Sequence, residues 1–308
     1  MVRAVVTRLR DRFEALLLDL DGTLYRGNEV IPGAPEALSG DHSAQALMYV
    51  TNNASRSAGV VAAHLSELGF LADADQVVTS AQAAAHLLAD RLPPGASVLI
   101  VGADDLAAEV ERVGLRPIRR FGDDVPAAVV QGYSPQIAWP DLAEAAYAVR
   151  AGALWVAANT DATLPTERGL APGNGAMVAA LRTATDAEPI VAGKPYAPLV
   201  EDALARAGSR SALIVGDRLD TDIDGALCVN LESLLVLTGV STLADLGARS
   251  ADRLPTYVSG SLDALNHPVL HDDPVRHSDG DLVEQLSDRL HRHPGKAIPI
   301  IGQCRVRE

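Results

Sequence analysis

Two aspartates two positions apart, Asp19 and Asp21, offer the clearest chemistry in the sequence. They follow an apolar run at residues 15–18, which has the length of a buried strand, and Gly22 after them indicates a loop. In an extended chain both carboxylates would point to one side, and Leu20 between them would point to the core. Two carboxylates this close repel each other, so they should share a cation or titrate apart. With a shared Mg²⁺, Asp19 could stay ionised as a nucleophile while Asp21 acts as a general acid, which suits phosphoryl transfer.

A second polar stretch, at residues 51–57, begins where the apolar run 46–50 ends. It offers the hydroxyl group of Thr51, the carboxamides of Asn52 and Asn53, and the N–H groups of a helix start. Together these groups would form a neutral cradle for a phosphate, and the helix dipole would favour its charge.

Lys194 and Asp217 complete the candidate set. Lys194 follows a short apolar run and could neutralise both a phosphate oxygen and a carboxylate nucleophile. Asp217 comes directly after Gly216 at the end of another apolar run and would supply a further oxygen ligand for an octahedral Mg²⁺. Asp222 could orient metal-bound water or Lys194 without touching the metal.

Each stretch has an ordinary alternative when it is taken singly. Residues 19–22 could form a plain turn or a calcium-type loop, and residues 51–57 could simply cap a helix. Most lysines are solvated, and an acidic stretch such as residues 217–222 is also typical of a solvated helix start. The order and placement of the four stretches carry more information than any one of them.

The elements that would position these residues are strands alternating with helices. This pattern predicts an α/β protein with a mostly parallel sheet and helices on both faces. Ligands bind such sheets at the carboxyl ends of the strands, where all four stretches fall. We expect Asn230 to close the last helix in the left-handed conformation. The expected strands are 15–18, 46–50, 97–101, 127–130, 154–157, 190–192, 212–215 and 234–237, and the expected helices are 58–68, 81–92, 106–113, 142–150, 176–183, 199–207 and 220–229.

Length and composition exclude several classes of function. The 308 residues are enough for about two domains, and 48% of them are hydrophobic. No apolar run approaches the ~20 residues of a membrane span, and residues 1–12 lack an apolar signal core, so we expect a cytoplasmic protein with no membrane partner. The formal net charge of −14 argues against a nucleic-acid partner, whose phosphates would be repelled. Cys228 and Cys304 have no metal-type spacing, and we assign them no chemistry.

In this order the four stretches resemble the motifs of the haloacid dehalogenase-like phosphatases. Residues 19–23 match the first motif, Thr51 the second, Lys194 the third, and Gly216 with Asp217 the fourth. The forms at residues 51–53 and 216–222 are most similar to the subfamily IIA branch. That branch includes the 4-nitrophenylphosphatases, the phosphoglycolate phosphatases and the NagD nucleotidase. Within it, the actinobacterial glycerol-3-phosphate phosphatases are most similar.

The resemblance covers about residues 15–265 and implies a domain organisation. A Rossmann-like core would comprise residues 1–79 and 190–266, and an α/β cap of 110 residues would be inserted at 80–189. Within the cap, residues 159–165 and 169–175 resemble the loop that faces the active site. Residues 267–308, which hold five of the eight histidines, have no counterpart and are expected to form a tail that is flexible or depends on a partner.

The resemblance also implies an activity, which is Mg²⁺-dependent hydrolysis of a phosphomonoester through a phospho-aspartate. Asp19 would attack phosphorus, and Asp21 would protonate the leaving alkoxide and later deprotonate water. Mg²⁺ would be held by Asp19, the backbone carbonyl of Asp21, and Asp217. The residues expected to bind the phosphate or the rest of the substrate are Thr51, Asn52, Asn53, Lys194, Asn159, Asp161 and Arg168.

The partner and the substrate follow from the resemblance alone. We expect a small phosphorylated metabolite, with glycerol 3-phosphate first and phosphoglycolate, a nucleotide or another sugar phosphate as alternatives, and a homodimer through the cap is a possible assembly. A non-enzymatic phospho-acceptor, a phosphomutase or phosphotransferase, and an idle binding module remain alternative classes. A phospho-acceptor would explain neither the general-acid position of Asp21 nor a cap of this size, and an idle module is disfavoured because no motif residue is missing.

Overall fold

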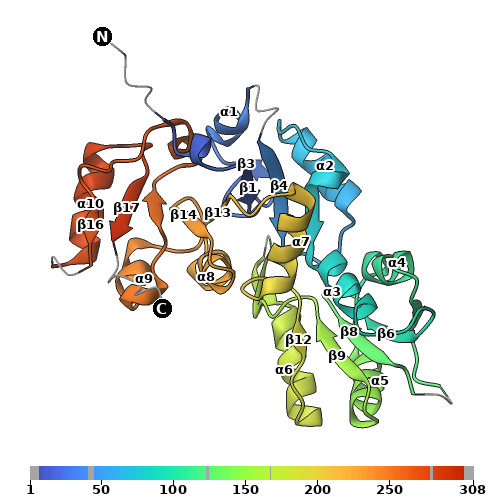
Figure 1. The fold of residues 1–308 in the computed structure, drawn as a ribbon. Helices are drawn as coiled ribbons and strands as arrows, with labels where there is room; N and C mark the ends of the chain where they lie inside the picture. The colour runs from blue at the N-terminus through green and yellow to red at the C-terminus, as the bar shows by residue number, and fades with distance from the viewer. Residues whose placement is uncertain (1–6, 41–44, 123–124, 167, 278–279, 302–308) are drawn as a thin grey trace, which may run out of the picture. The chain divides into compact units, whose positions relative to one another are not determined.

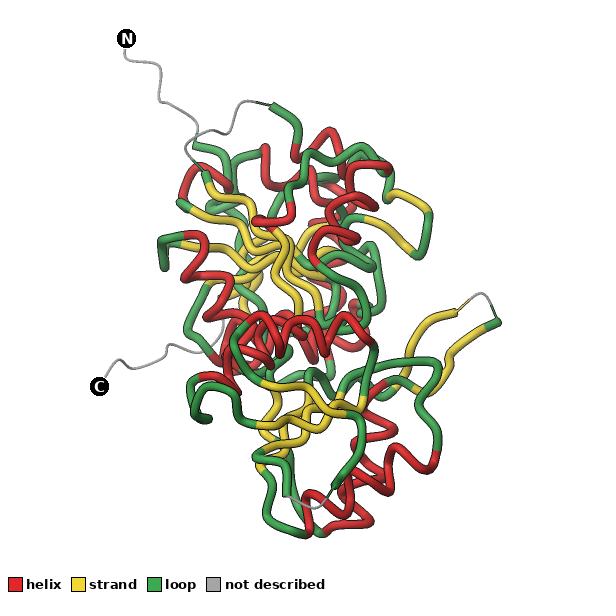
Figure 2. The backbone as a smooth tube through the Cα atoms, turned by 90° about the vertical axis from the view of Figure 1, so that its right-hand side faces the viewer, coloured by secondary structure: helices red, strands yellow, loops and turns green. Residues whose placement is uncertain are grey.

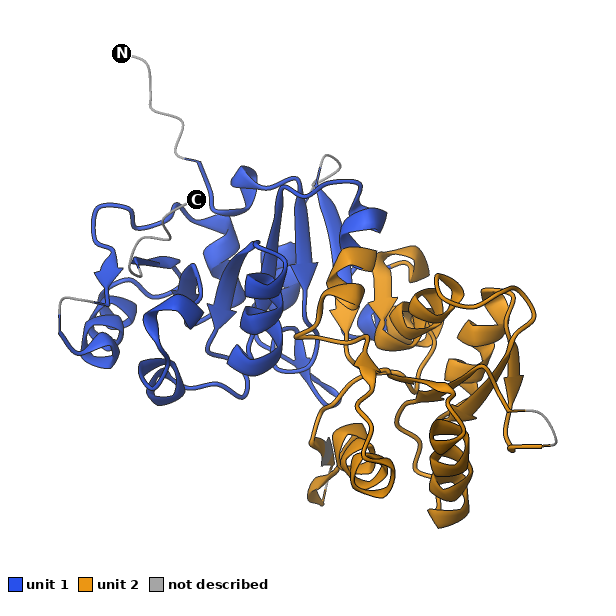
Figure 3. Ribbon diagram, turned by 60° about the horizontal axis from the view of Figure 1, so that its bottom comes forward, with its two compact units in different colours: residues 1–49, 64–72, 203–308 blue, residues 50–63, 73–202 orange. Residues whose placement is uncertain are grey.

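The computed structural model describes residues 7–40, 45–122, 125–166, 168–277 and 280–301. The chain divides into two compact units (Figure 3). Unit 1 comprises residues 1–49, 64–72 and 203–308, and unit 2 comprises residues 50–63 and 73–202. Both units combine a largely parallel sheet with helices (Figure 1), so the predicted α/β class is confirmed. The predicted division into a core and a cap inserted at 80–189 stays a prediction.

A mostly parallel sheet forms the centre of unit 1. Its strands are β1 (Ala15–Leu18), β4 (Ala46–Thr51, whose last two residues belong to unit 2), β13 (Ala212–Gly216), β14 (Glu232–Val236), β15 (Tyr257–Ser259), β16 (Val275–Arg276) and β17 (Ile298–Ile301), and a separate hairpin pairs β2 (Tyr25–Arg26) with β3 (Glu29–Val30). The strands of the sheet that are named here follow the order β16-β17-β15-β14-β13-β1-β4, and the sheet continues to β5 (Val77–Thr79). Within the order from β16 to β4, the pairing of β15 with β17 is the antiparallel one among the described residues. β1 is buried at all four positions, as a strand in the middle of a parallel sheet should be. Leu18, the last residue of β1, pairs with Val215, so β1 ends one residue before β13 does.

Helices and short turns connect the strands of unit 1. They are η1 (Arg10–Arg12), α1 (Ala34–Leu38), the π-helical turn η3 (Leu219–Ile223), α8 (Asp224–Cys228), α9 (Leu243–Gly247), η4 (Ala251–Arg253), η5 (Leu262–Asn266) and α10 (Leu282–Arg292). Two more helices span the division between the units, α2 (Ala58–Glu67) and α7 (Ala197–Ala207). The expected helix at 220–229 is thus η3 followed by α8, and Asn230 after it has the predicted left-handed conformation, with a φ of 58°. Within the described residues no helix has the length and apolarity needed to cross a membrane.

Much of the segment beyond residue 266 has regular secondary structure. β16 and β17 extend the sheet of unit 1, and α10 begins at a side-chain cap, because Asp281 accepts hydrogen bonds from the N–H groups of Val283 and Glu284. Leu282 and Leu286 of α10 are buried in a cluster that also includes residues of β14, β15 and β17. The structure therefore shows packed elements where the sequence predicted a tail. β16 and β17 have only two and four residues, and their apolar side chains pack against residues that are distant in the sequence. Strands this short show no hydrophobic periodicity in the sequence. Cys304 lies outside the described residues.

Unit 2 is built on a five-stranded parallel sheet with the order β12-β9-β8-β6-β7. These strands are β6 (Ser97–Val101), β7 (Arg116–Ile118), β8 (Ala128–Gln131), β9 (Leu154–Ala157) and β12 (Ile190–Val191), and the unit also contains β5 (Val77–Thr79). Its helices are η2 (Ala74–Gln76), α3 (Ser80–Ala89), α4 (Asp104–Arg112), α5 (Trp139–Arg150) and α6 (Asn174–Thr185). An antiparallel hairpin of β10 (Thr163–Thr166) and β11 (Gly169–Pro172) is separate from this sheet, as Figure 2 shows. A cluster of buried side chains from β6, β8, β9, α5 and α6 forms the core of this unit.

Candidate active site

Three carboxylates gather at the carboxyl edge of the sheet in unit 1. Asp19 follows β1, Asp217 follows β13, and Asp222 lies in η3, and one oxygen atom from each lies within 4.8 Å of the other two. Asp217 and Asp222 are 0% and 1% exposed, and Asp19 is half-buried. Three like charges this close raise one another's energy, and carboxylate oxygens are the ligands that Mg²⁺ prefers. The donor set therefore fits a Mg²⁺ ion, and it includes Asp222, to which the sequence assigned only an orienting role.

Asp217 is held by the loop that follows β14. Its Oδ2 accepts a hydrogen bond of 2.6 Å from the N–H of Val240, and its backbone carbonyl accepts one of 3.2 Å from Ser241. A Cβ atom on Gly239 would lie 2.0 Å from Oδ2 of Asp217, and one on Gly22 would lie 2.5 Å from its Cγ. Both glycines leave space that the carboxylate fills. Sequence reasoning missed this loop, although a glycine just past the apolar run 234–237 was the available signal.

Asp222 is fixed by the first turn after β13. The N–H of Arg218 donates a hydrogen bond of 3.0 Å to its Oδ2. A Cβ atom on Gly216 would lie 2.2 Å from the same oxygen, so glycine is required where the strand passes the carboxylate. The π-helical turn η3 thus directs Asp222 back toward the strand end from which Asp217 emerges.

Asp21 lies in the loop between β1 and β2, and its carboxyl group is not one of the three in the cluster. The loop is tied by a hydrogen bond of 2.7 Å from the N–H of Gly22 to the carbonyl of Tyr25. Partial burial raises the pKa of the Asp21 carboxyl group, while a backbone hydrogen bond from Gly27 and the charge of Arg26 act in the opposite direction. A raised pKa favours the protonated form, which is the form that a general acid needs.

The second and third predicted motifs lie in unit 2, where the structure brings them together. The side chain of Asn52 makes two hydrogen bonds to the main chain of Lys194. Its Oδ1 accepts from the N–H of Lys194 at 2.8 Å, and its Nδ2 donates to the carbonyl of Lys194 at 3.1 Å. The Lys194 ammonium donates to the carbonyl of Val50 at 3.1 Å, and Lys194 is only 4% exposed. Its position is therefore closely determined by the protein.

Thr51 and Asn53 form a compact polar turn after β4. Thr51 Oγ1 accepts from the N–H of Asn53 at 3.1 Å, and Asn53 Oδ1 accepts from the N–H and hydroxyl groups of Ser55 at 2.7 and 2.9 Å. Side chains that bond to nearby backbone in this way stabilise a turn. The helix that was expected to begin close to this turn is α2, which starts at Ala58.

Three predicted substrate residues lie at positions 159–168, and two of them lie beside Asn52. Asn159 is buried, and its Nδ2 donates to the carbonyl of Asn52 at 2.6 Å. Both carboxylate oxygens of Asp161 lie 3.3 Å from Asn52 Nδ2. Arg168 is exposed in the turn between β10 and β11, where its N–H donates to Thr166 Oγ1. The structure thus groups Asn159 and Asp161 with Asn52 and places Arg168 on the hairpin.

Two family models match the chain. A model described as haloacid dehalogenase-like hydrolase matches residues 16–116, and a model described as HAD-hydrolase-like matches residues 191–265. The first match contains Asp19, Asp21 and Thr51, and the second contains Lys194 and Asp217. The chain belongs to the haloacid dehalogenase-like hydrolases. The resemblance predicted from the four motifs is confirmed.

Known proteins similar to this haloacid dehalogenase-like hydrolase are phosphatases. D-glycerol 3-phosphate phosphatase from Mycobacterium tuberculosis is 60% identical over 253 residues, which cover 82% of this chain and 71% of that protein. A crystal structure of glycerol phosphate phosphatase from the same organism in complex with magnesium has 58% sequence identity and a TM-score of 0.81, and the match covers 84% of this chain and 78% of that one. An acid sugar phosphatase from Staphylococcus saprophyticus is 35% identical over 256 residues, which cover 82% of this chain and 96% of that protein.

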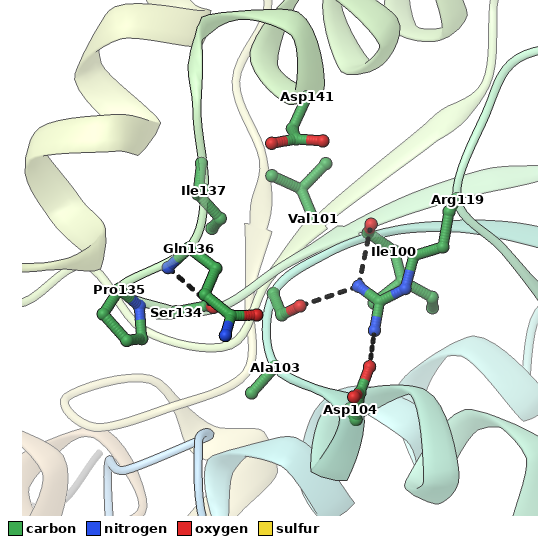
Figure 4. Close-up of a pocket in the computed structure, with 11 residues that line it drawn as sticks. Ile100, Val101, Ala103, Asp104, Arg119, Ser134, Pro135, Gln136, Ile137 and Asp141 are labelled. Carbon is green, nitrogen blue, oxygen red and sulfur yellow. Dashed lines mark hydrogen bonds and ion pairs between the residues drawn. The ribbon is translucent and has the colours of Figure 1, made fainter.

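This hydrolase also has a pocket of about 390 Å³ in unit 2, beyond the carboxyl ends of β6 and β8 (Figure 4). Its three charged side chains are all engaged by neighbouring protein atoms. Arg119 donates to the carbonyl of Gly102 at 2.7 Å and pairs with Asp104, and Asp141 accepts from the N–H of Ala138 at 2.8 Å. The predicted site residues are not part of its lining.

Proposed function

We propose that this hydrolase cleaves a phosphomonoester through a phospho-aspartate and that its substrate is glycerol 3-phosphate. The observation that carries the proposal is the cluster of Asp19, Asp217 and Asp222 at the ends of β1 and β13, in a chain that belongs to this family. The substrate rests on the relative from M. tuberculosis, which is named D-glycerol 3-phosphate phosphatase.

Asp19 is the proposed nucleophile. Its carboxylate attacks phosphorus in line, the bond from phosphorus to the ester oxygen breaks, and the leaving alkoxide takes a proton from Asp21. Asp21, now ionised, removes a proton from the water molecule that hydrolyses the phospho-aspartate. The products are the free alcohol and inorganic phosphate, and both aspartates return to their starting protonation states.

Asp19, Asp217 and Asp222 would hold the Mg²⁺ ion, and the backbone carbonyl of Asp21 remains a predicted fourth protein ligand. When bound, Mg²⁺ acts as a Lewis acid that offsets the negative charge of the carboxylates and the transferring phosphoryl group. The tight fit of Gly22 and Gly239 against Asp217 keeps this carboxylate in one place, so little reorganisation is required during reaction.

Groups of unit 2 are the proposed partners of the substrate. Thr51, Asn53 and Lys194 would bind the phosphate, since they offer a hydroxyl group, an amide and a buried ammonium close together along the network described above. Asp161 and Arg168 would contact the alcohol part of the ester, through a hydroxyl group and an anionic group respectively. The homodimer through the cap and the cytoplasmic location stay predictions.

The test is the release of inorganic phosphate from a panel of esters, measured with Mg²⁺ and again with excess chelator. The panel contains glycerol 3-phosphate, phosphoglycolate, a nucleoside monophosphate, a hexose phosphate and 4-nitrophenyl phosphate. We expect Mg²⁺-dependent turnover with the highest kcat/KM among the metabolites for glycerol 3-phosphate. The hexose phosphate covers the substrate class named for the staphylococcal relative.

Three results would count against the proposal in different ways. A higher kcat/KM for another ester would replace the substrate and leave the chemistry in place. Transfer of phosphate to an added alcohol in preference to water would indicate a phosphotransferase. The absence of Mg²⁺-dependent phosphate release from every ester would overturn the assignment as a phosphatase.

A further inference from the structure

The side-chain amide of Asn52 forms the same two hydrogen bonds to the backbone of Lys194 that a neighbouring β-strand would form. It accepts from the N–H of Lys194 and donates to the carbonyl of the same residue, so both polar groups of that peptide segment are bound by one rigid amide. Gly193 makes this approach possible, because a Cβ atom there would lie 2.7 Å from Asn52 Oδ1 and 2.6 Å from the carbonyl oxygen of Ala158. The location of the Lys194 main chain therefore depends on the location of Asn52.

Two buried side chains in turn fix the main chain of Asn52. Its carbonyl oxygen accepts a hydrogen bond of 2.5 Å from Ser80 Oγ and one of 2.6 Å from Asn159 Nδ2. Ser80 is 0% exposed, and Asn159 is 5% exposed. Two donors that converge on one carbonyl from different elements, α3 and the loop after β9, leave that peptide little freedom to move.

A third amide, Asn174, continues the network away from Lys194. It is the first residue of α6 and is 2% exposed, and its Nδ2 donates to the carbonyl of Asn159 at 2.6 Å and to that of Gln131 at 3.4 Å. A Cβ atom on Gly175 would lie 2.2 Å from the carbonyl oxygen of Thr160, so the helix start lies directly against the loop that carries Asn159. Buried polar groups are costly to leave without partners, and this network therefore has one strongly preferred arrangement.

We infer that Asn52, Ser80, Asn159 and Asn174 are positioning residues that set the location of Lys194, and that none of the four needs to touch the substrate to affect catalysis. The inference rests on the proposed function, in which Lys194 neutralises the phosphate. It gives Asn52 and Asn159 a different role from the direct substrate contact that the sequence suggested, because the amides of both residues are already bonded to protein groups.

The test is a double-mutant cycle between Asn174 and Lys194. Asn174→Ala, Lys194→Ala and the double variant are compared with the wild type in kcat and KM for 4-nitrophenyl phosphate with Mg²⁺. Misplacing a catalytic group by about 1 Å can cost ~100-fold in rate, so we expect Asn174→Ala to lower kcat by about 10- to 100-fold. In the Lys194→Ala background the same change should have less than a twofold effect, because the group that it positions is gone. Equal losses in both backgrounds, or no loss in the wild-type background, would overturn the inference.

A second readout covers variants whose turnover is below detection. The affinity for inorganic phosphate is measured by calorimetry in the presence of Mg²⁺. Asn174→Ala should weaken this affinity in the wild-type background and leave it nearly unchanged in the Lys194→Ala background. This measurement also separates the two proposals, because a wild type that binds phosphate but releases none from any ester would refute the phosphatase and still allow the cycle to be completed. Phosphate affinities that combine additively would overturn the positioning role.

Two further variants control for simple loss of stability. Asn266→Ala removes a half-buried amide of unit 1 that donates to the carbonyl of Ala37 at 2.9 Å, and it should lower the Tm without lowering kcat. If Asn174→Ala does not fold, Ser80→Ala enters the same cycle, since it removes one hydroxyl donor and almost no volume. The inference predicts the same dependence on Lys194 for Ser80→Ala, and an additive result there would contradict it.

Discussion

Replacing Gly239 by alanine should damage the carboxylate cluster without straining the backbone. The new methyl carbon would lie 2.0 Å from Oδ2 of Asp217 and 2.3 Å from its Cγ, and real Cβ atoms essentially never approach other heavy atoms within 3.0 Å. The carboxylate must therefore move by about 1 Å or more. The φ of Gly239 is not in the left-handed region, whereas that of Gly22 is +92°, so only the substitution at Gly239 isolates the steric effect on Asp217.

The expected change in the Mg²⁺ requirement can be estimated from the hydrogen bond that Asp217 would lose. Its hydrogen bond of 2.6 Å from the N–H of Val240 joins a charged acceptor to a backbone donor, and such bonds contribute about 1.5–3 kcal/mol. Since each 1.4 kcal/mol is a factor of ten, we expect the Mg²⁺ concentration for half-maximal activity to rise by about 10- to 100-fold. A displacement of about 1 Å near the reacting atoms should also lower kcat by roughly 100-fold at saturating Mg²⁺.

The assay is phosphate release from glycerol 3-phosphate titrated with Mg²⁺, with thermal unfolding measured in parallel. Gly260→Ala is the matched control, because it lies in the same unit, has no left-handed φ, and a Cβ atom there would meet nothing within 4 Å. This control should behave as the wild type does. If Gly239→Ala has the same Mg²⁺ requirement and kcat as Gly260→Ala, then Asp217 does not hold the metal and the reasoning from the cluster is wrong.

Three further predictions concern the nucleophile, the hairpin and a helix end. Asp19→Asn should abolish turnover while leaving the Tm within a few degrees, because an amide of nearly the same shape cannot attack phosphorus, and activity within tenfold of the wild type would exclude the covalent mechanism. Arg168→Ala should change kcat/KM unequally among the esters of the panel and least for 4-nitrophenyl phosphate, whereas equal losses would show that the hairpin does not contact the leaving group. Asn230→Ala should destabilise folding by about 1 kcal/mol and Asn230→Gly should not, because the residue has a φ of 58°; urea unfolding of both variants checks this.

The α/β architecture could be predicted because strands of a parallel sheet are buried on both faces and read as continuous apolar runs. The runs at 97–101 and 154–157 coincide with β6 and β9 in the structure. Short strands could not be found in this way. β16 has two residues, and it becomes a strand because β17 lies beside it, which is a contact between residues about 25 positions apart in the chain. Local sequence does not report such a contact.

The same distinction applies to the candidate site. The proximity of Asp19 and Asp217 followed from strand order, because the carboxyl ends of adjacent parallel strands meet at one edge. The participation of Asp222 did not follow, because it depends on the π-helical turn η3, which regular helical spacing does not predict. The contact between Val240 and Asp217 depends on the path of a loop, and loop paths are determined by the tertiary contacts around them.

The hydrogen bonds of Asn52 determine the relative positions of the proposed phosphate-binding residues. The carboxylate cluster, which includes the proposed nucleophile Asp19, belongs to unit 1, whereas Thr51, Asn53 and Lys194 belong to unit 2. Lys194 is more than 140 residues away from Thr51 in the sequence, yet both are attached to Asn52, one by a peptide bond and the other by two hydrogen bonds. The distance between the Thr51 hydroxyl group and the Lys194 ammonium group is therefore fixed for a phosphate that binds to both. This holds for any arrangement of the two units. This spacing is a property of the network alone, so changes at Asn174 or Ser80 should alter phosphate affinity even when the carboxylate cluster is intact.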